Sequence, residues 1–254
     1  MLKLLRDTVE SFFVEVGQYG LLIARSFSSI GEFKTYRENL LSQLVRIGVD
    51  SLPIVALASA FSGMVLTVQT AYQLFSPFIP RSIIGGVVVP SMILELGIVT
   101  PALVLAGRVG ARIAAELGTM RVTEQVDALE AMGLNSVAYL VVPRVLAGVI
   151  MFPVLYAAAS FVGITGGMLA GSLGGYLTAQ EFIEGAREWF KPYDVVFGSI
   201  KALVFGYLIT SISCAKGFFT TGGAEGVGQS TTEAAVTSCV MVLLADYVLA
   251  LVLL

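Results

Sequence analysis

Three ionisable residues interrupt long apolar stretches of this 254-residue chain, namely Glu95, Lys201 and Asp246. A charge in hydrocarbon costs on the order of 3 kcal/mol or more, so such residues are functional candidates. Acidic and basic groups together can relay protons, form an ion pair or bind the charged headgroup of a lipid. The alternatives are a pair that only fixes helix register and, for Asp246, bonds to hydroxyl groups on neighbouring helices.

Other site chemistry finds little support in the sequence. The chain has no histidine, and Cys214 and Cys239 lack the spacing of a metal or redox motif. The segment GAEGVGQST at 223–231 resembles a phosphate-binding loop, but Gln229 replaces the lysine that contacts the phosphates. No basic stripe with interleaved aromatic residues indicates nucleic acid binding. We therefore expect no catalytic residue, no metal, no cofactor and no nucleic acid partner, so the chain is not expected to be an enzyme.

Hydropathy shows which elements position the three charges. Hydrophobic residues make up 56% of the chain and charged residues only 13%, as is typical of a membrane protein. A helix needs roughly 20 apolar residues to cross a bilayer. Five segments are long enough: Ser51 to Ala71, Ile83 to Ala106, Val145 to Leu173, Val195 to Ala215 and Ala234 to Leu254. Because the alternating pattern of barrel strands is absent, we predict an all-α, polytopic membrane protein with about five transmembrane helices.

The region before the first span predicts a separate amphipathic element. Apolar residues recur there at helical spacing, as expected for a helix lying in the membrane interface: Val9, Phe12, Phe13 and Val16. A helix packed on a soluble partner is the alternative. We therefore divide the chain into an N-terminal interfacial region, residues 1–47, and a transmembrane domain, residues 48–254.

Basic residues predict the orientation. The N-terminal 47 residues contain six Lys or Arg, and the segment between the second and third spans contains four. The loops on the other side contain only Arg81, Arg187 and Lys191. By the positive-inside rule, the N-terminus and the segment between spans two and three lie in the cytoplasm, and five spans place the C-terminus outside.

The charged segment ARIAAELGTMRVTEQVDALEAMG, residues 111–133, lies in that cytoplasmic loop. We expect Thr123 to cap a helix that has Glu124 and Asp127 in its first turns, and Gly133 to end it. Its two faces differ in polarity: Val122, Val126, Leu129 and Met132 on one side, and Glu124, Asp127 and Glu130 on the other. Amphipathicity leaves two interpretations, a helix resting on the bundle or a charged face offered to a cytoplasmic protein.

Two further patterns concern packing and the outer membrane surface. Glycines at 163, 167, 171 and 175 recur every fourth residue and allow another helix to approach closely, within the chain or at a subunit interface. The segment at about 176–194 carries Trp189, Phe190 and Tyr193, which suits a short extracytoplasmic helix with an aromatic interface anchor.

Several motifs resemble one family of membrane proteins. They are AGRVGARIAAELGTMRVTEQVDALEAMG at 106–133, GMVLTVQ at 63–69, LELG at 94–97, VVPRVLAG at 141–148 and SIKALVFG at 199–206. Together they resemble the MlaE/YrbE permeases, the membrane subunits of MCE-associated ABC transporters that move lipids across the bacterial envelope. The resemblance extends from about residue 40 to the end of the chain.

The resemblance implies a function and a set of partners. The chain would be a multi-pass permease of the bacterial inner membrane, forming a homodimer, with lipid as substrate. Its partners would be a cytoplasmic ABC ATPase that binds the ATP, an MCE-domain protein on the extracytoplasmic side and a small STAS-type accessory protein. The segment at about 112–133 matches the coupling helix that docks on the ATPase, with these candidate contact residues: Arg121, Thr123, Glu124, Asp127 and Glu130. The candidates for the lipid cavity are Leu66, Gln69, Tyr72, Leu74, Glu95 and Lys201.

One departure from the family and one rival function remain at this stage. Many relatives have proline directly after Gly97, whereas this chain has Ile98 there and Pro101 three residues later, so the kink in the second span is expected further on. The rival is an ion-coupled carrier or channel in which Glu95, Lys201 and Asp246 relay protons.

The depth of the charged residues in their spans can be estimated from the helical rise. On straight helices Glu95 lies about 18 Å into the second span and Lys201 about 9 Å into the fourth. We therefore expect a shared polar lining rather than a tight salt bridge, with Lys201 nearer the outer mouth.

Overall fold

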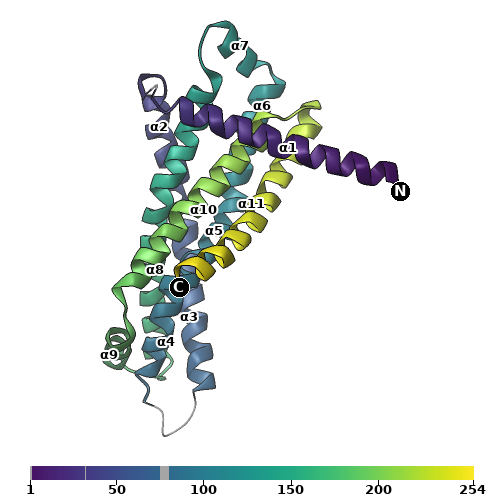
Figure 1. Ribbon diagram of the computed structural model, residues 1–254. Helices are drawn as coiled ribbons and strands as arrows, with labels where there is room; N and C mark the ends of the chain where they lie inside the picture. The colour runs from purple at the N-terminus through teal and green to yellow at the C-terminus, as the bar shows by residue number, and fades with distance from the viewer. Residues whose placement is uncertain (1, 32, 75–79) are drawn as a thin grey trace.

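The computed structural model describes residues 2–31, 33–74 and 80–254, and its regular elements in these ranges are all helices. Within them, five helical segments are long and apolar enough to cross a membrane: Tyr36–Gln73, Ile83–Val122, Val137–Leu173, Pro192–Phe218 and Gly223–Leu253. These segments run up and down one elongated bundle (Figure 1). The all-α, polytopic fold predicted from the five apolar stretches is confirmed.

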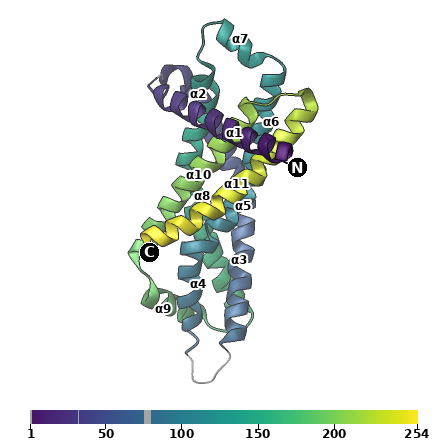
Figure 2. The same cartoon turned by 45° about the vertical axis from the view of Figure 1, so that its right-hand side comes forward.

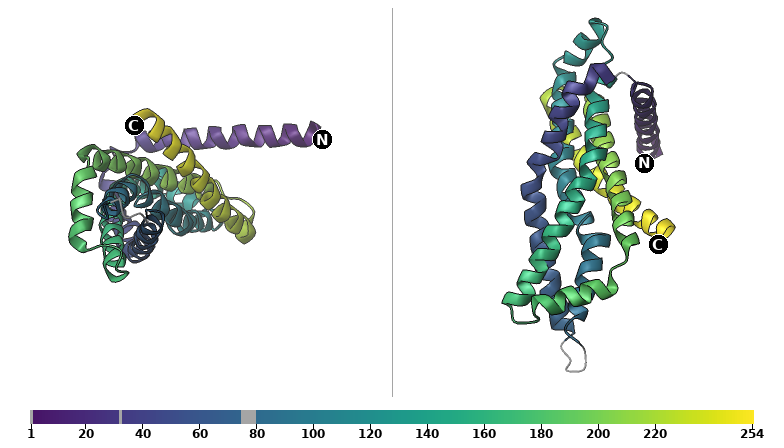
Figure 3. Two further views of the ribbon diagram at one scale, coloured as in Figure 1. Left: turned by 90° about the horizontal axis from the view of Figure 1, so that it is seen from below. Right: turned by 90° about the vertical axis from the view of Figure 1, so that its left-hand side faces the viewer.

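The first span is longer than expected and follows a separate N-terminal helix. The span consists of α2 (Phe33–Ile47), the 3₁₀ helix η1 (Val49–Ser51) and α3 (Leu52–Gln73). Before it, α1 (Leu2–Ser28) lies across one end of the bundle and extends well beyond it (Figures 1 and 3). The side chains of Val9 and Phe12 lie outside the described residues, whereas those of Phe13 and Val16 are exposed, as an interfacial helix requires.

The second span is a broken helix. It comprises α4 (Ile83–Ser91), the π-helical segment η2 (Met92–Leu96), α5 (Val99–Leu105), a second π-helical segment η3 (Ala106–Gly110) and α6 (Ala111–Val122). The interruption at Gly97 and Ile98 falls one turn before Pro101, because a proline ring clashes with the preceding turn and supplies no N–H. The π-helical segments carry Glu95 and Arg108, and such segments are frequent at functional sites.

The rest of the chain forms the other three spans and two short helices. The elements are α7 (Gln125–Ala131), the π-helical η4 (Val137–Val141), α8 (Val142–Leu173), α9 (Ala179–Trp189), α10 (Pro192–Phe218) and α11 (Gly223–Leu253). Helix α7 lies beyond the same end of the bundle as α1, and α9 lies at the opposite end (Figures 1 and 2). In the most apolar stretch of each span, 56% of the residues of α10 are buried inside the protein, compared with 11% of those of α11. Helix α10 is therefore central and α11 peripheral.

Glycines allow α3 and α8 to pack backbone against backbone. A Cβ atom on Gly63 would lie 1.9 Å from the carbonyl oxygen of Gly163, closer than any real contact. A Cβ atom on Gly167 would lie 2.6 Å from the Thr67 hydroxyl oxygen, and one on Gly171 would lie 3.2 Å from the Thr67 methyl group. The predicted glycine stripe is therefore a packing seam within the chain at these positions. Gly175 does not belong to it, since it follows the end of α8 with a φ of +70°.

Helix α9 begins with a reciprocal cap. The Thr178 hydroxyl accepts from the Glu181 N–H at 3.2 Å, and the Glu181 carboxylate accepts from the Thr178 N–H at 2.6 Å. These bonds to Thr178 hold the pKa of Glu181 below its usual 4.5. At the other end of α9, the ring of Trp189 packs against Gly86 and remains half-exposed, as an interface anchor would.

Candidate functional site

Lys201 is the centre of a charge cluster that joins the second, fourth and fifth spans. Its Nζ lies 2.9 Å from Glu95 Oε1 and 2.5 Å from Asp246 Oδ1, and it donates to the Leu94 carbonyl at 3.0 Å. The contact with Asp246 is an ion pair that lacks hydrogen-bond geometry. The Lys201 side chain is fully buried, whereas 44% of the Glu95 side chain and 21% of that of Asp246 are exposed. The single positive charge of the ammonium group is therefore shared between two carboxyl groups.

This contact corrects one expectation. Glu95 and Lys201 form a direct salt bridge rather than a shared polar lining, and the Lys201 side chain is fully buried. The expectation assumed straight helices and a fourth span starting at Val195. Helix α10 starts at Pro192, so Lys201 lies about 14 Å along it, and the π-helical turn around Glu95 changes the path of the second span. The long lysine side chain covers the remaining distance.

Of the four other cavity candidates, Leu66, Gln69 and Tyr72 lie in the C-terminal half of α3, and Leu74 directly follows that helix. Leu66 and Leu74 are half-buried against the core, whereas Gln69 and Tyr72 are exposed. Among the described residues, no hydrogen bond or ion pair links these four to Glu95 or Lys201. Two cavities occur elsewhere, one of about 550 Å³ between α1, α10 and α11 and one of about 300 Å³ between α4, α8 and α9. Neither is lined by the α3 candidates.

The segment at 111–133 is not one helix, and the cap expected at Thr123 is wrong. Helix α6 continues the second span to Val122, so Thr123 ends that helix and its hydroxyl donates to the Thr119 carbonyl at 2.8 Å. Glu124 then turns the chain with a φ of 59°, in the left-handed region, and α7 starts at Gln125. Gly133, with a φ of +76°, follows the end of α7 as expected.

Contacts within the segment hold α7 against α6. Val126 is fully buried, while Arg121 and Asp127 form an ion pair at 2.6 Å. The Glu130 carboxylate accepts from the Ser136 hydroxyl at 2.6 Å. Glu124, by contrast, is exposed, and its side chain forms no hydrogen bond or ion pair with the described residues. The predicted acidic face is therefore present at the tip of the molecule, and Glu124 is its least engaged member.

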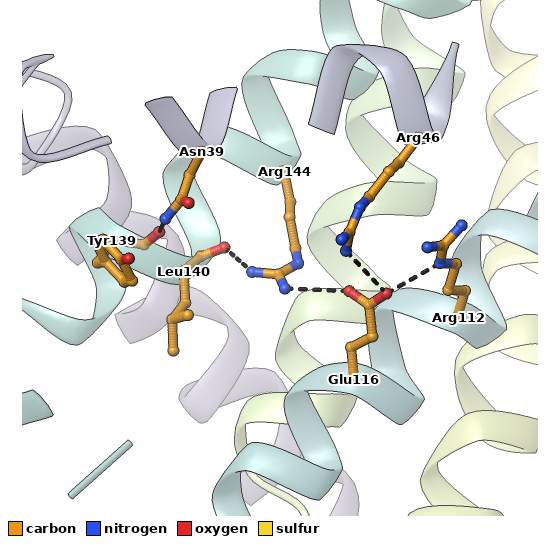
Figure 4. Close-up of polar contacts among 7 residues, drawn as sticks. All are labelled: Asn39, Arg46, Arg112, Glu116, Tyr139, Leu140 and Arg144. Carbon is orange, nitrogen blue, oxygen red and sulfur yellow. Dashed lines mark hydrogen bonds and ion pairs between the residues drawn. The ribbon is translucent and has the colours of Figure 1, made fainter. Parts of the chain in front are cut away.

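Sequence reasoning missed a second charge cluster, which surrounds Glu116 (Figure 4). The Glu116 carboxylate contacts Arg112 at 3.0 Å, Arg144 at 3.3 Å and Arg46 at 3.5 Å. Arg112 and Glu116 lie four residues apart on α6, a spacing that predicts a helical ion pair. Arg46 on α2 and Arg144 on α8 come from distant segments, so no local pattern could have placed them there.

The family assignment follows from the comparison of this sequence with known proteins. The family model described as "Permease MlaE" matches residues 40–252. The chain belongs to the MlaE permease family. A probable ABC transporter permease protein of Rickettsia bellii is 42% identical over 234 residues, covering 92% of this chain and 90% of the relative. The intermembrane phospholipid transport system permease protein MlaE of Haemophilus influenzae is 33% identical over 244 residues, covering 95% and 92%.

A plant protein extends the range of the MlaE family relatives. The chloroplastic protein TRIGALACTOSYLDIACYLGLYCEROL 1 of Arabidopsis thaliana is 40% identical over 216 residues, covering 85% of this chain and 61% of the plant protein. The chain is thus a multi-pass membrane protein and the permease subunit of an ABC transporter.

Proposed function

We propose that this permease moves phospholipid or a related lipid between the inner membrane and an MCE-domain protein, and so maintains lipid asymmetry of the outer membrane or lipid homeostasis of the envelope. The observation that carries the proposal is membership of the MlaE family over residues 40–252, with a relative named as an intermembrane phospholipid transport permease. The geometry is compatible, since Lys201, Glu95 and Asp246 place polar side chains between three of the spans.

The proposed assembly is a homodimer with two cytoplasmic ATPase subunits, an MCE-domain protein outside and a STAS-type accessory protein inside. The ATP would be bound by the ATPase. In this chain Gln229 and its neighbours, which resemble a phosphate-binding loop in sequence, lie within helix α11. The N-terminus and α7 would face the cytoplasm, because they lie at the same end of the bundle and the basic residues concentrate there.

Copurification tests the ABC assignment. The full-length chain is tagged and purified from its native membrane in mild detergent, and its companions are identified by mass spectrometry together with any bound lipid. We expect a protein with Walker motifs and a phospholipid in the same complex. A chain that purifies without an ATPase and transports solute alone under an imposed ion gradient would contradict the proposal.

We propose that Arg121, Thr123, Glu124, Asp127 and Glu130 form the surface through which α7 contacts the ATPase. Glu124 gives the cleanest test, because its side chain has no hydrogen bond or ion pair within the described residues to lose. Glu124→Lys is expected to weaken ATPase copurification and to lower lipid-stimulated ATP hydrolysis. Surface changes of this kind usually alter stability by under about 0.5 kcal/mol. The matched control is Glu184→Lys in the exposed part of α9, at the opposite end, which should change neither readout.

We further propose that the lipid path passes the outer half of α3, at Leu66, Gln69, Tyr72 and Leu74, and reaches Glu95 beside Lys201. Photocrosslinkers at Leu66 and Tyr72 should capture phospholipid more strongly than crosslinkers at Val248 and Val252, which are exposed on the peripheral α11. Equal capture at both pairs would indicate ordinary membrane contact and remove the α3 residues from the path.

An ion-coupled carrier is a second candidate, because Glu95, Lys201 and Asp246 form a contiguous cluster. The two functions differ in their energy source. In proteoliposomes that contain the ATPase, lipid movement should require ATP and remain unchanged when a protonophore collapses the proton gradient. Transport that follows the proton gradient without ATP would favour the carrier.

A further inference from the structure

Four arginines from four elements converge at the end of the bundle where α7 lies. They are Arg46 on α2, Arg108 on η3, Arg112 on α6 and Arg144 on α8. One carboxylate, Glu116, contacts three of them, and Arg108 donates to the Ser51 hydroxyl at 2.8 Å. The cluster therefore holds three positive charges in excess. Asp50, one turn beyond Arg46, is exposed and forms no ion pair with these arginines, and including it still leaves an excess of two.

The arginines differ in how free they are to bind an anion. Arg144 is nearly buried and also donates to the Leu140 carbonyl at 2.6 Å, so it supports the packing of α8 on α6. The side chains of Arg46 and Arg112 are 46% and 45% exposed, and among the described residues Glu116 is the only ion-pair or hydrogen-bond partner of each side chain. A guanidinium has five N–H donors. Most donors of Arg46 and Arg112 are therefore available to an incoming anion.

Arg46 lies between a polar cavity mouth and an exposed apolar surface. A cavity of about 20 Å³ lies between the arginines, and its lining combines Gln43 and Glu116 with the apolar Ile47, Val109 and Ile113. It is too small for a phosphate group, so an anion would sit at its mouth. Beside Arg46, Leu41, Val45 and Val49 are four residues apart and at least half exposed, forming one apolar stripe. Guanidinium groups next to an exposed apolar stripe match a molecule with a phosphate and acyl chains, whereas a soluble anion would leave the stripe unused.

We propose that Arg46, Arg108 and Arg112 bind the phosphate of an anionic phospholipid in the cytoplasmic leaflet, with its acyl chains along Leu41, Val45 and Val49. Basic pockets between membrane helices on the cytoplasmic side bind such headgroups in general. The site is distinct from the proposed transport path, because Arg112 lies seventeen residues beyond Glu95, about 25 Å along the helical span. The inference rests on the orientation proposed above and does not require that the chain transport lipid.

The test is a lipid-binding titration of the purified full-length chain in non-ionic detergent, with native mass spectrometry as the readout. The probes are dioleoylphosphatidylglycerol and the zwitterionic dioleoylphosphatidylcholine. The parent protein should prefer phosphatidylglycerol, and Arg46→Gln/Arg112→Gln should lower that affinity about 30-fold, since each basic side chain near a membrane contributes about 1 kcal/mol. Arg46→Lys/Arg112→Lys keeps both charges and should retain most of the preference.

The matched control is Arg81→Gln/Arg187→Gln, which removes the same charge from exposed positions at the opposite end of the bundle. This variant should bind phosphatidylglycerol like the parent. An equal loss in both Gln variants would mean that only net charge matters and would overturn the site. Displacement of the lipid by inorganic phosphate at about 10 mM would assign the arginines to a soluble anion instead. Should the Gln variant unfold, the Lys variant decides: loss of preference in that folded, equally charged protein would also overturn the site.

Transport and binding are read out separately. Normal phosphatidylglycerol binding at Arg46 and Arg112 in a chain that moves no phospholipid would refute the proposed function and leave this inference intact. Normal transport by a chain without the lipid preference would do the reverse.

Discussion

Replacing Lys201 by methionine tests the charge cluster most directly. Methionine fills much of the volume of the lysine stem but leaves Glu95 and Asp246 without their shared counterion. Removing one partner of a buried ion pair typically costs about 3–5 kcal/mol. Because nearly half of the Glu95 side chain is exposed and can be solvated, we expect the lower value, about 3 kcal/mol. For a chain of this size that corresponds to a melting temperature about 6–12 °C lower.

The assay is thermal unfolding of the purified variants in the same detergent, with intrinsic fluorescence as the probe. A triple variant, Lys201→Met with Glu95→Gln and Asp246→Asn, removes both carboxylates and should recover most of the lost stability. If Lys201→Met melts within about 2 °C of the parent, the carboxylates do not depend on the ammonium group and the reasoning is wrong. If the triple variant melts as low as the single one, the loss comes from packing of the lysine stem instead.

Three further predictions concern other parts of the fold. Gly63→Ala should destabilise the α3–α8 seam by about 1–3 kcal/mol in the same melting assay, because its Cβ meets the Gly163 carbonyl, whereas Gly107→Ala, with open space around it, should cost nothing. Glu124→Gly should relieve about 1 kcal/mol of left-handed backbone strain, and hydrogen exchange of α7 should slow; faster exchange would argue against strain at that turn. The pKa of Glu181 is lower in the folded protein, so its cap contributes stability above pH 4.5 and loses it as the pH falls through the depressed value; exchange of the α9 amides should then accelerate, and Glu181→Gln should remove this pH dependence.

Features that depend only on residues close together in the sequence could be predicted from it. The five apolar stretches became five candidate spans because crossing hydrocarbon requires a run of apolar residues, which hydropathy measures directly. Gly133 lies at the end of α7 because glycine adopts a positive φ without steric cost. The segment at 176–194 likewise contains a short helix, α9, with Trp189 as its last residue and Phe190 directly after it.

The helix cap predicted at Thr123 was wrong because a local sequence pattern does not show where a long, packed helix ends. The local pattern, a threonine followed by acidic residues, is typical of a helix start. In the folded chain α6 is the continuation of a 40-residue span, and its packing carries the helix to Val122. Thr123 therefore ends a helix, and Glu124 forms the turn into α7.

By itself the sequence determined that this protein is a bundle of membrane-spanning helices, which residues are charged within it, and to which family it belongs. Only the tertiary structure decided which charges meet. Lys201 and Glu95 are 106 residues apart and their contact depends on a π-helical turn and on where α10 begins, and the cluster around Glu116 draws on α2, α6 and α8. Hydropathy and helix-ending signals act over a few residues, whereas an ion pair depends on the depth and rotation of two separate helices, which the packing of the whole bundle sets.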